Sequence, residues 1–224
     1  WRDFISNLSH ELRTPVSVIR ANSETLIDGA LEDKKQAKVF AKAILHNSER
    51  LSDMVSSLLD LTRIEYGELK LNFQNINLNE FIKNFILSIS NLSKKKNINI
   101  QYKSSHIGDI NADPQAIERI LNNLVDNAIK YSKEDSQIVI STSNDSDDHI
   151  KVMVEDNGPG ISDEDQDYIF GRFFRTASAR ATDNQGSGLG LAIVKHLVNS
   201  LNGEVGIDSV PGKGSVFWFT VPKF

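Results

Sequence analysis

The feature that most constrains this chain is an apolar seam that runs through roughly its first third. Apolar residues recur at steps of three and four, or their sums, at Ile5, Leu8, Leu12, Ile19 and Leu26. After a break around Asp28-Gly29-Ala30, a heptad rhythm resumes at Ile44, Leu51, Met54, Leu58 and Leu61 and runs up to Ile64. The sequence therefore predicts two amphipathic helices joined by a short turn. Because one helical hairpin cannot cover all of its own apolar stripe, we expect a homodimer whose two antiparallel hairpins form a four-helix bundle.

The periodicity changes after Tyr66-Gly67, and a domain boundary is predicted there, dividing the chain into residues 1–66 and 67–224. The second part alternates short β-favouring segments with helical patterns and is predicted to be an α+β sandwich, a mixed sheet packed on helices. The expected strands are Leu69–Phe73, Ile98–Tyr102, Ile138–Thr142, Ile150–Glu155, Glu204–Asp208 and Ser215–Val221, with helices near Leu78–Leu92, Pro114–Tyr131 and Leu189–Leu201. The polar stretch between Phe174 and Gly186 has no apolar period, so we expect it to be a mobile lid.

Charge and composition exclude several classes of function. The net charge of -5 provides no overall basic field for a polyanion, so nucleic-acid binding is not expected. The chain has no cysteine, which rules out disulfides and thiolate metal sites and fits a reducing compartment such as the cytoplasm. No apolar run approaches the roughly 20 residues that span a bilayer. Because the chain opens at Trp1 inside a helical pattern, we expect a fragment of a longer protein, with any sensor or membrane segment upstream.

A histidine in the first helical segment is a candidate nucleophile. His10 lies off the apolar seam, so the helix should present its ring to solvent. A neutral imidazole can accept a phosphoryl group near pH 7, because its ordinary pKa of about 6.5 leaves much of it unprotonated. Glu11 is the nearest carboxylate that could take or hold the ring proton. Since a single exposed helical histidine is most often an ordinary surface residue, the interpretation depends on the string from Phe4 to Pro15.

Polar residues share one face of the helix predicted from Pro114. Asn123, Asn127 and Lys130 are separated by steps of four and three, which brings two amides and a cation side by side. Amide oxygens can bind Mg²⁺, and a lysine can bind phosphate as a point charge. Taken alone, the pattern is also that of an ordinary polar helix face.

Two glycine-containing loops complete the candidate site. Asp156 ends a predicted strand and enters the turn Asn157-Gly158-Pro159-Gly160, where a buried carboxylate could accept a hydrogen bond from the amino group of adenine and select ATP over GTP. Gly186, Gly188 and Gly190 open the last predicted helix, whose free N–H groups suit phosphate. Each signal alone also fits a plain turn. The glycine loop is not a P-loop, because no Gly-Lys-Ser/Thr follows it.

In order and in combination, these strings resemble the sensor histidine kinases of two-component systems, in particular the phosphate-sensor-like group. The most specific of them is Ser9-His10-Glu11-Leu12-Arg13-Thr14-Pro15. The resemblance covers essentially the whole chain. It implies a dimerising phosphoacceptor hairpin followed by an ATP-binding domain of the gyrase, Hsp90 and MutL type.

The resemblance also implies roles for individual residues. His10 would be the phosphoacceptor, Glu11 the neighbouring acid or base, and Thr14 would orient water in the reverse phosphatase reaction. Asn127 would hold Mg²⁺, and Arg175 would contact the γ-phosphate. The implied nucleotide site consists of Asn123, Asn127, Lys130, Tyr131, Asp156, Gly158, Gly160, Gly186, Gly188, Leu189 and Gly190, with Phe170, Phe173 and Phe174 as an aromatic box before the lid.

The function implied is ATP-dependent autophosphorylation of His10, followed by transfer of the phosphoryl group to an aspartate of a response regulator receiver domain. Residues 66–67 would form the hinge on which the two domains close. The chain would be the cytoplasmic portion of a membrane sensor. Two alternatives remain at this point: an Hsp90-like or MutL-like ATPase that forms no phosphoenzyme, and a pseudokinase that acts as a dimeric scaffold or chiefly as a phosphatase on the regulator.

Overall fold

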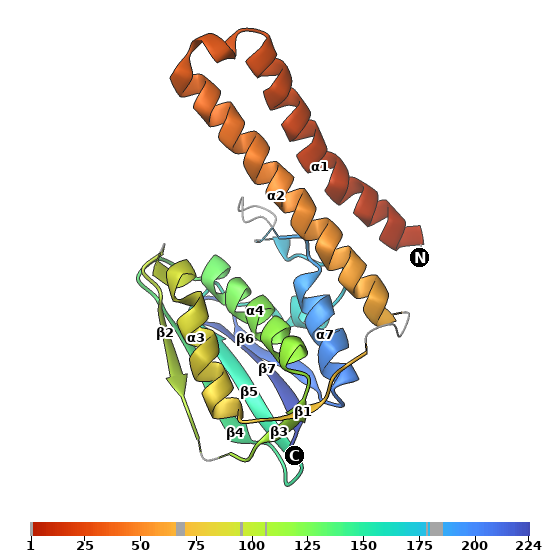
Figure 1. Cartoon of the computed structure of the whole chain (residues 1–224), viewed down its shortest axis with the longest axis vertical. Helices are drawn as coiled ribbons and strands as arrows, with labels where there is room; N and C mark the ends of the chain where they lie inside the picture. The colour runs from red at the N-terminus through yellow and green to blue at the C-terminus, as the bar shows by residue number, and fades with distance from the viewer. Residues whose placement is uncertain (1, 66–69, 95, 106, 178, 180–185) are drawn as a thin grey trace.

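The chain folds into a long helical hairpin that stands on an α/β domain (Figure 1). In the computed structural model, helix α1 (Arg2–Ile27) is joined through a short 3₁₀ turn, η1 (Ala30–Glu32), to helix α2 (Lys34–Glu65). The residues that the structure describes are 2–65, 70–94, 96–105, 107–177, 179 and 186–224. The predicted hinge at residues 66–67 and most of the predicted lid, residues 178 and 180–185, lie outside the described residues. Of the helices within these ranges, none combines the length and the apolar character of a membrane span.

The predicted seam only partly buries itself within the hairpin. Leu8, Leu12, Ile19 and Leu26 are half-buried, whereas Ile5 is 46% exposed. On α2, Leu61 is 1% exposed because it joins the hydrophobic core of the α/β domain. At this residue the apolar stripe is therefore covered by the α/β domain, a partner that the sequence did not indicate. Heptad spacing shows which side chains need cover but not which partner supplies it.

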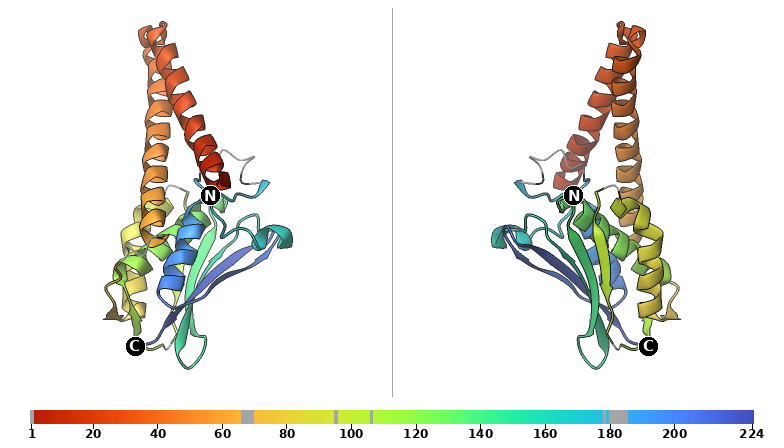
Figure 2. Two further views of the ribbon diagram at one scale, coloured as in Figure 1. Left: turned by 90° about the vertical axis from the view of Figure 1, so that its right-hand side faces the viewer. Right: turned by 90° about the vertical axis from the view of Figure 1, so that its left-hand side faces the viewer.

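The sheet of the α/β domain is mixed, as expected. Its strand order is β2-β4-β5-β7-β6, with β2 and β4 parallel and the other neighbours antiparallel. The strands are β2 (Asn99–Lys103), β4 (Gln137–Asn144), β5 (His149–Asp156), β6 (Val205–Val210) and β7 (Gly214–Pro222). Helices α3 (Leu78–Lys94), α4 (Pro114–Tyr131) and α7 (Gly190–Ser200) cover one face of this sheet (Figure 2). The core lies between these two layers.

The predicted strand at Leu69–Phe73 is misplaced over its described part, residues 70–73, while Leu69 lies outside the described residues. Residues 70–73 have no regular structure, and the strand β1 begins later, at Gln74–Ile76. It pairs with β3 (Ile110–Ala112) in a separate two-stranded sheet, where Ile76 faces Ile110. Neither β3 nor the short helix α5 (Asp163–Gln166) was expected from the sequence. Strands this short are specified by their pairing partner more than by their own composition.

Helix α4 positions most of the candidate site, and an aspartate fixes its start. The Asp113 carboxylate accepts hydrogen bonds from the backbone N–H groups of Gln115 (2.8 Å) and Ala116 (3.1 Å), and from Asn72 (2.7 Å). At the other end, the Lys96 ammonium donates to two C-terminal carbonyls of the helix, each at 2.9 Å. Capping at both ends satisfies backbone groups that have no partner within the helix.

Asp113→Ala is expected to lower the free energy of unfolding by about 2 kcal/mol, because it removes an N-cap and the bond to Asn72 together. Urea denaturation measures this loss. Asp113→Asn keeps a side-chain acceptor, so its loss in free energy of unfolding should be no more than half of the loss in Asp113→Ala. Equal stability of Asp113→Ala and the natural chain would contradict this account of how α4 begins.

Helix α2 contacts the α/β domain directly. The Asp60 carboxylate pairs with the Arg119 guanidinium on α4, and Leu61 packs into the domain core beside this pair. Helix α7 also contacts the C-terminal part of α2 (Figure 1). Helix α2 of the hairpin therefore borders the space between the hairpin and the α/β domain.

Candidate functional site

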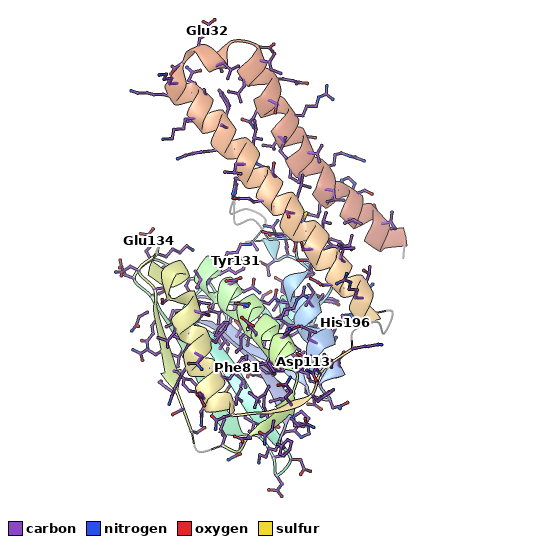
Figure 3. All side chains as sticks on the ribbon, viewed as in Figure 1. Glu32, Phe81, Asp113, Tyr131, Glu134 and His196 are labelled. Atoms are coloured by element: carbon purple, nitrogen blue, oxygen red, sulfur yellow. The ribbon has the colours of Figure 1, made fainter. Side chains whose placement is uncertain are left out.

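A cavity of about 720 Å³ lies between α2 and the α/β domain. It is within the size range of small-molecule sites. Tyr131, at the end of α4, lies on the side of the domain that faces the hairpin (Figure 3). The predicted site residues that line the cavity are Asn123, Asn127, Lys130, Tyr131, Asp156, Gly160, Arg175, Gly186, Gly188 and Gly190. Residues from four separate segments of the sequence thus meet in one place.

The polar face predicted for α4 lines the cavity. The Asn123 amide donates to the Arg119 carbonyl at 2.9 Å, which leaves its own oxygen directed toward Gly190. A Cβ atom at Gly190 would lie 2.7 Å from that oxygen, so only glycine fits there without a shift. This close approach joins the start of α7 to the middle of α4.

Lys130 is the most strongly perturbed cation in the described part of the chain. Its pKa is lowered to about 8, first by burial and then by repulsion from Arg175, Arg50 and Lys96. The ammonium also lies 5.2 Å from the centre of the Tyr131 ring. A site that gathers repelling cations in this way is suited to an anion, which would relieve the repulsion.

Asp156 is buried at the end of β5, which excludes the alternative of an exposed aspartate in a plain turn. Its side chain is 6% exposed in this position, and one carboxylate oxygen accepts the Gly158 N–H at 2.7 Å. Burial raises the pKa of this carboxyl group, while the hydrogen bonds from the Gly158 and Ser215 backbones oppose the shift. The carboxylate borders the cavity and can accept a hydrogen bond from a ligand there.

The glycine-rich segment approaches the cavity through its backbone. Gly188 has φ +68, and a Cβ atom there would lie 2.8 Å from the Phe173 backbone. Its carbonyl accepts the Phe173 N–H at 2.9 Å, which holds the segment against the residues before the lid. The Leu189 side chain is 0% exposed and belongs to the core, so this residue does not line the cavity. Leu189 anchors the loop, and the glycines beside it face the space.

The aromatic residues before the lid are divided between core and site. Phe170, Phe173 and Phe174 all pack against the domain core, and Phe174 also lines the cavity. Arg175, the next residue, lines the cavity, and its guanidinium donates to the Ala179 carbonyl. Gly158 does not line the cavity, but its N–H fixes Asp156.

The candidate nucleophile lies on the hairpin and outside the cavity lining. His10 is exposed on α1, and Thr14, one turn further, donates a hydrogen bond to the His10 carbonyl at 3.3 Å. Glu11 pairs across the hairpin with Arg50 of α2, at 3.3 Å between Oε2 and Nη2. Because Arg50 itself lines the cavity, one ion pair connects the neighbour of His10 to the site.

Sequence reasoning missed the wall that α2 contributes. His46, Glu49, Arg50, Asp53 and Met54 all line the cavity. These residues follow no motif, and their helical spacing indicates only that they share part of α2. Their role depends on how the hairpin docks on the domain.

The donor set fits magnesium bound with a phosphate ligand. The described residues contain no cluster of three or more His, Cys, Asp or Glu side chains that could hold a metal by themselves. Mg²⁺ typically takes one or two protein oxygens and completes its shell with phosphate and water. The Asn127 amide on the cavity wall can supply one such oxygen.

Two family models together match most of the chain. Residues 112–224 match the histidine kinase-, DNA gyrase B-, and HSP90-like ATPase family, and residues 1–67 match the His Kinase A (phospho-acceptor) domain. The sensor histidine kinase WalK of Bacillus subtilis is 33% identical over 99% of this chain and 36% of its own length. The sensor-like histidine kinase SenX3 of Mycobacterium tuberculosis is 35% identical over 99% of this chain and 53% of its own length. The chain thus spans between about a third and about half of these relatives.

Solved structures of histidine kinases share the fold of this chain over nearly its whole length. Histidine kinase AdeS of Acinetobacter baumannii matches with a TM-score of 0.77 and 26% identity, over 95% of this chain and 97% of that one. Histidine kinase ThkA, in complex with the response regulator protein TrrA, matches with a TM-score of 0.81 and 27% identity, over 99% of this chain and 61% of that one.

Proposed function

The chain belongs to the sensor histidine kinases, and from this premise we propose that it uses ATP to phosphorylate His10 and then passes the phosphoryl group to an aspartate of a response regulator. The observation that carries the proposal is the single cavity in which the α4 face, Asp156, Arg175 and the glycine loop meet next to the helix pair that bears the histidine. The complex of ThkA with its response regulator supports the choice of partner.

The chemistry assigns a task to each group. Lys130, Arg175 and the N–H groups at the start of α7 bind the phosphates, and Asp156 accepts a hydrogen bond from the adenine amino group. Asn127 would hold Mg²⁺ through its amide oxygen, and the bound ion would neutralise phosphate charge. The His10 ring nitrogen attacks the γ-phosphorus, the bond from phosphorus to the bridging oxygen of ADP breaks, and Glu11 accepts the ring proton. Thr14 orients water when the regulator is dephosphorylated. His10 lies outside the cavity lining, so the domains must move before transfer.

The proposal is tested by incubating the chain with γ-labelled ATP and Mg²⁺. Label on the protein should be lost in brief acid and kept in alkali, as for a phosphorus–nitrogen bond. It should then move to a receiver domain, where an acyl phosphate is labile to alkali. ATP hydrolysis without labelled protein would favour the ATPase alternative. If the chain neither hydrolysed ATP nor became labelled but removed phosphate from a phosphorylated regulator, the phosphatase scaffold would be favoured.

Lys130 should make the affinity for ATP depend on pH. Its pKa of about 8 means that the ammonium loses its proton above this pH, and a bound phosphate would raise the pKa again. Nucleotide binding should therefore take up a proton above pH 8. The affinity for ATP should be flat below pH 8 and fall above it by up to about tenfold per pH unit. Phosphate does not titrate in this range, since its second pKa is about 6.

Titration calorimetry between pH 7 and 9.5 measures this slope, and Lys130→Met is the matched variant. It should bind ATP more weakly at pH 7 and lose the decline above pH 8. An equal decline in both proteins would assign the titration to another group.

We also propose that two hairpins pair into a four-helix bundle, as the sequence predicts. Leu45 and Leu59 lie on one face of α2 and are 59% and 53% exposed, with Val55 (47%) beside them. Leu45→Glu combined with Leu59→Glu should produce a monomer by light scattering, because a dimer would bury both charges. Gln36→Glu, which changes an exposed residue on the opposite side of the helix, is the control. A natural chain that is already monomeric would refute this proposal. Attachment to a membrane stays a prediction of the resemblance.

A further inference from the structure

Arg50 is placed to act in both domains at once. Its Nη2 atom lies 3.3 Å from Oε2 of Glu11, and the same side chain lines the cavity, 17% exposed. Its Nε atom is buried and has no hydrogen-bond partner among the described residues. A buried N–H group without a partner is unfavourable, so a small shift of this side chain toward a ligand that supplies an acceptor would be favourable.

The charge around Arg50 indicates the kind of ligand. Arg50 lies close enough to Lys130 to lower the pKa of its ammonium group, as Arg175 does. The acidic groups in the same lining are Glu49, Asp53, Asp126 and Asp156. Within the described part of the chain, Arg50 forms its ion pair with Glu11 and with none of these four. Three cations from α2, α4 and the segment after Phe174 therefore converge on one part of the cavity.

We propose that Arg50 binds the terminal phosphate of the nucleotide through its Nε side and holds Glu11 through Nη2, so that a bound triphosphate fixes Glu11 beside His10. The guanidinium is a rigid planar fork with donors on separate edges, so one side chain can bind a phosphate and a carboxylate at the same time. Arg50 is then a phosphate contact from the hairpin and a positioning residue for the proton acceptor. This inference rests on the proposed function.

Two variants separate this role from a structural one. Arg50→Met should weaken binding of a non-hydrolysable ATP analogue by roughly 10-fold to 100-fold, which is the range for a lost bond between charged groups. Binding of ADP should change less than about threefold, because ADP lacks the terminal phosphate. Arg50→Lys, which keeps the charge but not the fork, should recover only part of the loss. Arg20→Met is the matched control, since Arg20 pairs with Glu24 on α1 and is exposed.

A double-mutant cycle with Glu11→Gln tests the coupling. If Arg50 acts through Glu11, the rate of His10 phosphorylation in the double variant should be no lower than in the slower single variant, within about threefold. If the effects of the two single substitutions on the phosphorylation rate multiply in the double variant, the coupling is overturned. If Arg50→Met weakens binding of the ATP analogue and of ADP equally, or weakens neither, the phosphate contact is overturned. If the natural chain bound neither nucleotide, the proposed function would fail. If Arg50→Met bound both nucleotides with an unchanged ratio of ATP-analogue affinity to ADP affinity, only this inference would be rejected.

Discussion

Replacing His10 with glutamine is expected to reduce phosphoprotein formation by at least about 1,000-fold, to background, while ATP binding stays within about twofold of the natural chain. The reason for the first effect is that glutamine has no lone pair basic enough to accept a phosphoryl group. The reason for the second is that His10 is exposed on α1 and lies outside the cavity lining. Filter binding of labelled protein and calorimetry of an ATP analogue measure the two quantities separately.

The matched control is His46→Gln. His46 lies on α2 and lines the cavity, so it is the rival acceptor by proximity alone. It should keep most of the labelling, because its neighbours do not form the string around His10. Labelling that survives His10→Gln and disappears in His46→Gln would reassign the phosphoacceptor to α2.

Asp156→Asn is expected to weaken ATP binding by at least roughly 100-fold. The carboxylate is buried, and the Gly158 and Ser215 backbones hold it in place, so it cannot turn away from a ligand. An asparagine in this position puts a donor where an acceptor is needed, either toward the Gly158 N–H or toward the adenine amino group. Sites built to satisfy a buried polar group discriminate strongly against a ligand that leaves it unpaired.

Calorimetry with ATP and GTP distinguishes recognition of the base from loss of fold. The natural chain should prefer ATP, and Asp156→Asn should lose most of that preference together with the affinity. Glu155→Gln removes a charge from the neighbouring exposed residue on β5 and should leave both affinities unchanged. An Asp156→Asn protein that binds ATP normally would show that the carboxylate does not contact the base.

The helical elements followed from sequence more accurately than the short strands did. The prediction for α4 matched its bounds, Pro114–Tyr131, because a proline after an aspartate marks the start of a helix and the apolar period marks its length. The strand expected at Leu69–Phe73 failed because β1 is defined by its pairing with β3 through Ile76 and Ile110. That pairing joins segments far apart in the chain.

The candidate site shows the same division. The face of Asn123, Asn127 and Lys130 could be predicted because helical geometry fixes which side chains lie together within one helix. The glycine loop could be predicted because close backbone approach excludes side chains. The sequence indicated each of these parts, and the structure adds that they line one cavity.

Local geometry made several features predictable from the sequence: the two amphipathic helices, the exposed histidine and the polar face of α4. Only the tertiary structure decided that α2 closes the cavity, that Leu61 enters the α/β core, and that Arg50 lies between Glu11 and Lys130. The physical reason is that an apolar stripe or a charge specifies a need for a partner, whereas docking of one domain on another selects which partner meets it.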